Sequence, residues 1–320
     1  MIEIPSFIDM HVHFRDPGFT SKETIETGIK CAKKGGYTGV CTMPNTKPVV
    51  DNPDTIKYIL NEAKKFNFKI YPVAAITKNL DSLELVDFDT LKEAGAVAFS
   101  NDGLPLLDKD VFLKALESEN LIISHCEDET NEVKWQIEMF ELAQNKGYKP
   151  KLHFCHVSKK ESVDLIRKAK AKGLKITAET APHYFTFTKD DVKENGVYKM
   201  NPPLGSEDDK KAITEALKDG TIDVIATDHA PHLKEEKLLS YSKSPNGIIG
   251  LETAFSLSYQ TLGLDLTIEK MAYAPRKILN IKDDSKIKVN LEESWIVNNT
   301  NSKCKISPYF DMKLKGKIYE

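Results

Sequence analysis

The first 260 or so residues of the chain alternate between short apolar runs and longer segments in which apolar residues recur with helical spacing. The apolar runs contain several β-branched residues and are apolar enough to be buried on both faces, as the strands of a parallel sheet are. These predicted strands cover residues 4–10, 38–43, 69–76, 95–100, 121–125, 151–156, 174–179 and 222–228. The predicted helices cover residues 21–35, 53–66, 80–94, 108–119, 128–147, 158–173, 206–219 and 250–262.

Eight strand–helix alternations predict an α/β fold of the (β/α)8 type, the TIM barrel. A doubly wound open sheet is the alternative that the same pattern allows. An apolar helix is expected near 266–280, and the tail at 285–320 alternates like short strands. We therefore expect a barrel over residues 1–284 and a small β appendage, built from the C-terminal tail, over residues 285–320.

Composition narrows the class of protein. With 40% apolar and 29% charged residues among 320, the chain is globular, which excludes a disordered chain, a collagen and a coiled coil. Its net charge of -3 offers no general attraction to nucleic acid or to an anionic membrane. No apolar run approaches the roughly 20 residues that span a bilayer, and the N-terminus lacks the features of a signal peptide. Five cysteines without a C-x-x-C spacing argue against a disulfide framework, so we expect a cytoplasmic protein.

Histidines provide the first candidate chemistry, because four of the eight lie at or just past the ends of predicted strands, where a barrel has its catalytic face. His11 and His13 are two residues apart, so in a strand they point the same way and can share a metal ion. His125 and His156 end the fifth and sixth strands. Each of these histidines alone also fits a hydrogen-bonded structural residue, but their repetition favours metal binding. His153 has the opposite parity to His156, and we expect it to be structural.

Two carboxylates complete this group. Asp228 ends the eighth predicted strand and Asp102 follows the fourth. Alone, Asp228 fits a helix N-cap and Asp102 fits an Asp-Gly turn. A carboxylate that faces a metal can also bind it and carry a proton. Four imidazoles with two carboxylates predict a pair of zinc-like ions bridged by a hydroxide. Cys126 could instead act as a thiol nucleophile, but the group as a whole favours attack by hydroxide.

Seven motifs occur in the order typical of class I dihydroorotases of the amidohydrolase superfamily, and this resemblance spans about residues 5–255. They read FIDMHVHFRDPG, MPNTKP, SHCED, HVSKKES, PHYF, NPPLG and ATDHAPH. The resemblance implies a metal-dependent enzyme of pyrimidine biosynthesis that interconverts N-carbamoyl-L-aspartate and L-dihydroorotate. It also implies two Zn²⁺ ions per subunit, with Asp228 as the general acid and base toward the bridging hydroxide. The implied ligands are His11, His13 and Asp228 for the first ion, His125 and His156 for the second, and Asp102 between them.

The resemblance also implies a set of substrate contacts from Arg15, Asn45, Asn201, His232 and the stretch around Gly247. Arg15 is one of only three arginines among 45 basic residues, and a guanidinium suits the carboxylate of dihydroorotate. Each residue has a plainer alternative. Arg15 fits a surface ion pair, Asn45 a turn and Gly247 a loop, while Asn201 and His232 fit structural roles.

Two other functions remain open. Hydantoinases and dihydropyrimidinases carry a carboxylated lysine at the end of the fourth strand, where this chain has VAFSND and no lysine. The neutral substrates of these enzymes, or of an allantoinase, would also leave Arg15 without a role. Another cyclic amidohydrolase is therefore the second hypothesis. The third hypothesis is a non-catalytic, dihydroorotase-like scaffold for aspartate transcarbamoylase. Inactive relatives usually lose metal ligands, and this chain has all six candidates.

The chain begins about ten residues before His11, whereas the resemblance implies a longer leading segment that forms much of a β-sandwich. We therefore expect a reduced sandwich, which a second subunit could complete. The two expected assemblies are therefore a homodimer and a complex with aspartate transcarbamoylase. The expected substrate is a small molecule.

Overall fold

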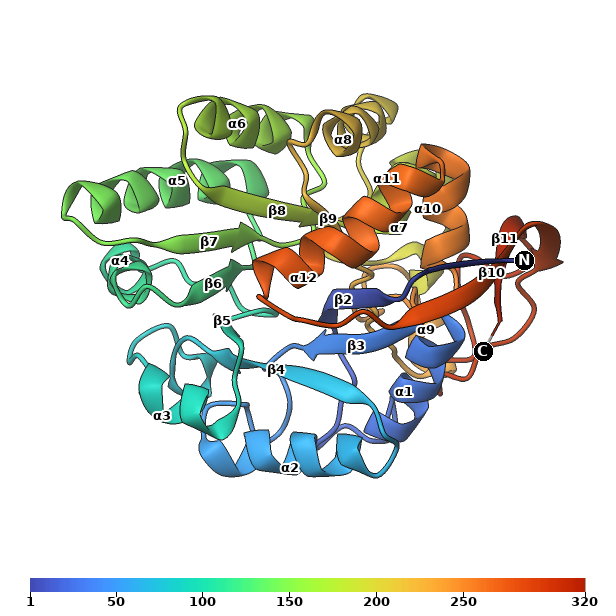
Figure 1. The fold of residues 1–320 in the computed structure, drawn as a ribbon, viewed down its shortest axis with the longest axis horizontal. Helices are drawn as coiled ribbons and strands as arrows, with labels where there is room; N and C mark the ends of the chain where they lie inside the picture. The colour runs from blue at the N-terminus through green and yellow to red at the C-terminus, as the bar shows by residue number, and fades with distance from the viewer. Residues whose placement is uncertain (320) are drawn as a thin grey trace.

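A computed structural model describes residues 1–319 (Figure 1). Its main sheet has eight parallel strands whose spatial order follows their order in the chain. They are β2 (Phe7–Val12), β3 (Tyr37–Thr42), β4 (Lys69–Ala75), β5 (Ala98–Ser100), β6 (Leu121–Ser124), β7 (Lys151–Phe154), β8 (Ile176–Thr180) and β9 (Val224–Ile225). The predicted (β/α)8 barrel is confirmed. The doubly wound sheet is wrong, because a sheet of that kind reverses its strand order.

The last and first strands meet through a short joint. Val12 and His229 form a parallel bridge, and the N–H of His13 donates to the carbonyl of His229 at 2.8 Å. The buried carboxylate of Asp9 strengthens this joint by accepting from the backbone N–H groups of His11 (3.0 Å) and Thr227 (3.1 Å). Asp9 thus ties the backbone of β2 to the segment that follows β9.

Helices surround the barrel (Figure 1). The main ones are α1 (Ile25–Lys34), α2 (Pro53–Lys64), α3 (Phe88–Ala94), α4 (Lys109–Glu117), α5 (Glu129–Asn145), α6 (Lys160–Ala171), α8 (Glu207–Asp219) and α10 (Ala254–Leu262). Short helices α7 (Pro182–Thr186) and α9 (Lys234–Lys237) lie in the loops after β8 and β9. The helix expected near 266–280 is found as α11 (Leu264–Ile268), a π-turn (Glu269–Tyr273) and α12 (Ala274–Ile278). No helix among the described residues is long and apolar enough to cross a membrane.

One predicted helix is wrong in its first half. The segment 80–94 becomes helical only at Phe88, after Asp87 accepts the N–H of Thr90 as an N-cap. Leu80 and Ser82 have φ angles of 59° and 63°, which a right-handed helix does not allow. Local turns therefore override the apolar spacing of this stretch.

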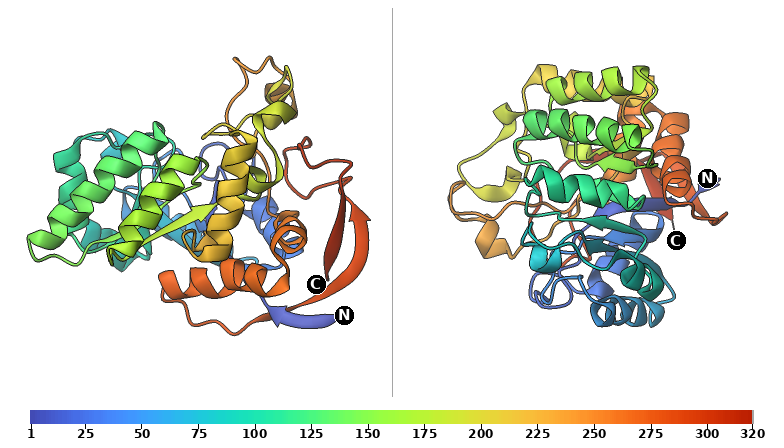
Figure 2. Two further views of the ribbon diagram at one scale, coloured as in Figure 1. Left: turned by 90° about the horizontal axis from the view of Figure 1, so that it is seen from above. Right: turned by 90° about the vertical axis from the view of Figure 1, so that its left-hand side faces the viewer.

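A small antiparallel sheet lies beside the barrel, in the order β1 (Ile2–Pro5), β10 (Lys286–Ile296) and β11 (Lys313–Tyr319). Figure 2 shows β10 and β11 as a curved ribbon to one side of the barrel. The first predicted strand splits at Ser6, so that β1 pairs with β10 while β2 enters the barrel. The tail supplies two of the three strands and the N-terminal residues supply the third. The proposed division at residue 284 stays a prediction.

The buried apolar side chains form separate clusters. The apolar side chains of Cys41, Val73, Ala98, Ile123 and Cys155 pack together in one of them. The main apolar cluster lies between the outer faces of the strands and the helices.

Arg276 is a buried arginine that holds the barrel and the small sheet together. Its Nη1 donates to the carbonyl oxygens of Ser6 (2.7 Å) and Ala272 (3.0 Å), and its Nη2 donates to the hydroxyl of Ser6 (2.8 Å). Its Nε donates to the carbonyl of Asp283 at 2.9 Å. One guanidinium thus links α12, the junction of β1 with β2, and the segment before β10.

We predict that Arg276→Lys lowers the free energy of unfolding by about 2–3 kcal/mol, because an ammonium cannot satisfy all these acceptors at once. Arg167→Lys is the matched control. Arg167 is 41% exposed and pairs with Asp164 and Asp219, so its replacement should change stability by less than about 1 kcal/mol. Urea denaturation measures both, and equal effects of the two substitutions would contradict this account.

Candidate active site and metal centre

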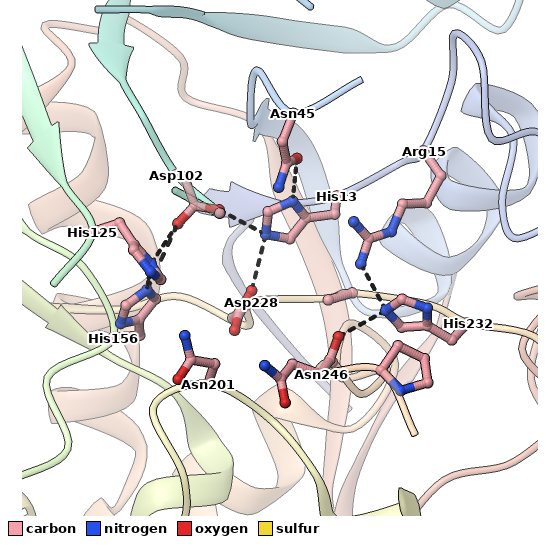
Figure 3. Close-up of a pocket in the computed structure, with 14 residues that line it drawn as sticks. His13, Arg15, Asn45, Asp102, His125, His156, Asn201, Asp228, His232 and Asn246 are labelled. Atoms are coloured by element: carbon pink, nitrogen blue, oxygen red, sulfur yellow. Dashed lines mark hydrogen bonds and ion pairs between the residues drawn. The ribbon is translucent and has the colours of Figure 1, made fainter. Parts of the chain in front are cut away.

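The six predicted metal ligands converge at the carboxyl ends of the barrel strands, and none is more than 7% exposed. His11 lies in β2, and the other five follow β2, β5, β6, β7 and β9 in chain order. Figure 3 shows five of the six around one pocket. They form two groups in which the candidate ligand atoms all lie within 4.8 Å of one another: His11 with His13 and Asp228, and Asp102 with His125 and His156.

Asp102 lies between the two groups. Its Oδ1 is 3.3 Å from His11 Nε2 and 3.3 Å from His125 Nδ1, while its Oδ2 is 3.3 Å from His13 Nε2. Asp228 Oδ1 approaches the same nitrogen of His13 at 3.2 Å. Asp102 therefore occupies the place that a bridging carboxylate would need.

Left-handed backbone conformations help to aim two of these side chains. His156 and Asp228 have φ angles of 34° and 48°, and they lie in the loops that follow β7 and β9. A residue with positive φ breaks the alternation of side chains along a strand. His153 belongs to the regular part of β7 and is fully buried away from the pocket lining, as expected for a structural histidine.

The hydrogen bonds of His11 and His13 fit a metal centre. An ionised carboxylate can only accept a hydrogen bond, so His11 Nδ1–H donates to Glu179 Oε1 at 2.8 Å. The other ring nitrogen, Nε2, then has a free lone pair, which faces Asp102. His13 Nδ1–H donates to the amide oxygen of Asn45 at 2.9 Å, which again leaves Nε2 as a free ligand. Among the described residues, His11 Nε2 and Asp102 Oδ1 are buried with no hydrogen-bond partner. Two facing lone pairs of this kind suit a cation between them.

The site also keeps its carboxylates ionised. Burial alone would raise the pKa of Asp102, but the imidazoles of His11, His125 and His156 outweigh this and hold that pKa well below its usual range. Burial likewise opposes ionisation of Asp228, but the neighbouring histidines outweigh this and lower its pKa. Ionised carboxylates are the form that binds a metal ion.

Another buried trio does not suit a metal. Glu23, Cys31 and His229 bring their ligand atoms within 4.8 Å of one another. However, His229 Nδ1 accepts from the N–H of Gly250 at 3.2 Å, so the proton of the neutral ring is on Nε2. That nitrogen lies 3.5 Å from a Glu23 oxygen and faces it as an N–H group, without a lone pair for a metal.

A cavity of about 280 Å³ opens beside the metal ligands, and all five predicted substrate-binding residues line it. In Figure 3, Arg15 and His232 lie on one side and His125 and His156 on the other, with Asp228 between them. The five predicted substrate-binding residues in this lining are Arg15, Asn45, Asn201, His232 and Gly247. The structure thus brings the predicted substrate residues and metal ligands into one site.

Arg15 presents a guanidinium without a direct ion-pair partner to this pocket. No carboxylate within residues 1–319 forms an ion pair with its guanidinium, and its Nε donates to the carbonyl of Pro231 at 3.3 Å. His232 Nδ1 accepts from Lys22 Nζ (3.1 Å), so His232 Nε2–H donates to the carbonyl of Asn246 (2.7 Å). Arg15 Nη2 lies 3.2 Å from the same Nε2. Both nitrogens carry hydrogens, so neither can accept a hydrogen bond from the other. The guanidinium is therefore free to bind an anion.

Gly247 forms part of the pocket wall and cannot carry a side chain. Its φ is 128°, and a Cβ here would lie 2.5 Å from the carbonyl oxygen of Ala230. Its N–H donates to the carbonyl of Lys199 at 3.0 Å, so a ligand could use only its carbonyl. Whether backbone groups of the stretch around Gly247 contact the substrate stays a prediction.

Sequence reasoning missed three residues that organise the site: Glu179, Asn246 and Lys22. Glu179 holds His11, while Asn246 and Lys22 determine which nitrogen of His232 is protonated. A carboxylate at the end of an apolar strand was the available signal for Glu179. Asn246 and Lys22 act through a loop carbonyl and a long side chain, and neither leaves a pattern in the sequence.

Comparisons with known proteins agree on the class of this chain. A profile of the dihydro-orotase-like family matches residues 1–181. The chain is 40% identical to a dihydroorotase of Acetivibrio thermocellus, over 99% of this chain and 84% of that protein. It is 41% identical to a dihydroorotase of Syntrophus aciditrophicus, over 99% of this chain and 85% of that protein.

Solved structures show the same fold at low sequence identity. L-hydantoinase from Arthrobacter aurescens has a TM-score of 0.83 at 23% identity, covering 99% of this chain and 83% of that one. The dihydroorotase from Saccharomyces cerevisiae in complex with 5-fluoroorotic acid has a TM-score of 0.79 at 18% identity, covering 100% of this chain and 99% of that one.

Fold and comparisons together define a cyclic amidohydrolase built on a (β/α)8 barrel. Within that class, the chain belongs to the dihydroorotase-like family. The family depends on metal ions, and this chain has the clustered histidines and aspartates that could hold them.

The environment of His232 predicts a pH dependence of stability. Burial, together with the charges of Arg15, Lys22 and Lys237, lowers the pKa of His232 to about 2. Between that value and the ordinary value of 6.5, the unfolded chain binds a proton that the folded one does not, so stability falls as the pH drops below 6.5. Between pH 7 and pH 5.5, we expect the free energy of unfolding to fall by about 1 kcal/mol less in His232→Gln than in the wild type. Urea denaturation at both pH values measures this, and identical losses would refute the assignment.

Proposed function

We propose that this chain is a dihydroorotase that interconverts N-carbamoyl-L-aspartate and L-dihydroorotate. The observation that carries the proposal is one pocket lined by an unpaired guanidinium and by five of the six clustered candidate metal ligands, with His11 directly behind them. A metal centre suits cleavage of a cyclic amide, and the guanidinium suits a substrate that also bears a carboxylate. The relatives at about 40% identity, all named dihydroorotase, support the same activity.

We assign the metal ligands as two sets that share one residue. The first ion would be held by His11, His13 and Asp228, the second by His125 and His156, and both by Asp102. Nitrogen and oxygen ligands in this number suit Zn²⁺, and two ions per chain is the expected occupancy. When bound, such ions polarise a carbonyl group and lower the pKa of water toward 7.

Asp228 is the residue we assign to proton transfer, because it belongs to the cluster and also lines the pocket. In hydrolysis, a water oxygen forms a bond to the ring carbonyl carbon while Asp228 accepts its proton. The bond from this carbon to the ring nitrogen then breaks, and Asp228 donates the proton to that nitrogen. Ring closure follows the same path in reverse.

The remaining pocket residues orient the substrate. Arg15 binds the carboxylate, and His232, a neutral neighbour, allows that charge to approach. Asn45 and Asn201 offer amide groups to the ring, and Gly247 leaves room for it because it lacks a side chain. The carboxylate thus lies on the Arg15 side and the reacting amide near Asp228, as the layout in Figure 3 suggests.

The decisive variant is Asp228→Asn, which keeps the shape of the side chain but removes its ability to accept a proton. We expect hydrolysis of dihydroorotate to fall by at least about 10³-fold, within the range of general acid–base catalysis. Metal content and circular dichroism on the same preparation control for loss of metal or fold. Turnover near the wild-type rate would show that Asp228 does not transfer the proton.

Arg15→Gln tests the choice of substrate. The wild type should prefer dihydroorotate to dihydrouracil, which lacks the carboxylate. The variant should lose about 10²-fold in kcat/KM for dihydroorotate while its rate on dihydrouracil changes little. Arg167→Gln, far from the pocket, serves as the control. A wild-type preference for dihydrouracil would instead indicate the function of a hydantoinase or dihydropyrimidinase.

The expected assemblies come from the resemblance alone. A homodimer, a complex with aspartate transcarbamoylase and a cytoplasmic location stay predictions. A purified protein that binds metal but shows no turnover, alone or with aspartate transcarbamoylase, would favour the scaffold hypothesis over catalysis.

A further inference from the structure

We infer that Glu179 is a positioning residue that keeps His11 in the form able to bind metal. The inference rests on the proposed metal centre and adds a residue that faces neither the pocket nor the substrate. Glu179 lies near the end of β8 inside the barrel and is 1% exposed. It does not line the cavity, so its effect on the reaction must pass through another residue.

Both oxygens of the Glu179 carboxylate are engaged. Oε1 accepts from His11 Nδ1–H at 2.8 Å, and Oε2 accepts from His153 Nε2–H at 3.1 Å. The far nitrogen of His153, Nδ1, accepts from the hydroxyl of Thr177 at 2.8 Å. The carboxylate is thus held directly by two histidine N–H groups, and its bond to His11 does not pass through Thr177.

The proton on His11 decides whether the site can accept a metal. If the proton were on Nε2, that nitrogen would donate to Asp102 Oδ1, 3.3 Å away, or to Asp228 Oδ1, at 3.6 Å. Such a hydrogen bond would occupy the lone pairs that the metal needs. Glu179 prevents this because an ionised carboxylate can only accept, which keeps the proton on Nδ1.

His13 shows why the two histidines can be tested separately. Its Nδ1–H donates to the amide oxygen of Asn45, and Asn45 also lines the pocket. A change at Asn45 would therefore alter metal binding and substrate binding together. A change at Glu179 should alter metal binding and leave the KM for dihydroorotate unchanged once metal is saturating.

The experiment compares the wild type with Glu179→Leu, Glu179→Gln and Thr177→Val. Each metal-free protein is titrated with Zn²⁺ in competition with a chromophoric chelator. We expect one zinc-binding step to weaken by about 10–100-fold in Glu179→Leu, the usual effect of losing such a partner. Glu179→Gln keeps an accepting oxygen without the charge, so a smaller loss of about 10-fold is expected.

Thr177→Val is the matched control, since it removes a buried hydrogen bond from the same strand without touching His11. Its Tm should fall, but its zinc affinity should stay within about twofold of the wild type. A second readout is the ¹⁵N spectrum of labelled histidine in the metal-free proteins, recorded at a pH that keeps His11 neutral, because Asp102 outweighs burial and raises the pKa of His11 well above its usual range. His11 should be protonated on Nδ1 in the wild type and in Thr177→Val, and should populate both tautomers in Glu179→Leu.

Wild-type zinc affinity in both Glu179 variants, with His11 still protonated on Nδ1, would overturn the role of Glu179. If Glu179→Leu does not fold, Glu179→Gln decides alone, and an unchanged affinity in that variant overturns it equally. A wild-type protein that binds no zinc would refute the proposed metal centre, and with it this inference. Dihydroorotate turnover by the wild type separates that failure from failure of the proposed activity.

Discussion

The crowding of Asp102 against three imidazoles is the constraint on which the rest of the site depends. Its oxygens lie 3.3 Å from nitrogens of His11, His13 and His125, and the Nε2 atoms of His11 and His13 face it as lone pairs. Buried lone pairs this close repel one another unless positive charge lies among them. The side chains are held together because the eight parallel strands, closed into a barrel by the hydrogen bonds of Asp9, all end at the same rim.

The partners of these side chains explain how a cluster of acceptors stays in order. Glu179 and Asn45 each hold the Nδ1–H of one histidine, so that the two Nε2 atoms face inward. Glu179 and its partner His153 are themselves fully buried, so solvent does not compete for these hydrogen bonds. The centre is thus supported from below by buried hydrogen bonds and is open only toward the pocket.

The pocket itself is electrically divided. One side has carboxylates and imidazoles suited to cations, and the other has Arg15 beside a neutral His232. A substrate with an anionic end and a polarisable amide matches this division better than a neutral ring does. The same division separates the proposed dihydroorotase activity from that of hydantoinases, whose fold the chain shares.

The sequence by itself determined the barrel and the residues that gather at its rim, because strand periodicity and motif order depend on local spacing. His11, His13 and Asp102 could be predicted for this reason. Only the tertiary structure decided what depends on distant partners: β1 pairs with β10, and Glu179 holds His11 from 168 positions along the chain. The helix expected from residue 80 fails for a different, local reason, because turns at Leu80 and Ser82 outweigh the apolar spacing. Hydrogen bonds between distant segments leave no periodic signal, so their partners became visible only in the folded chain.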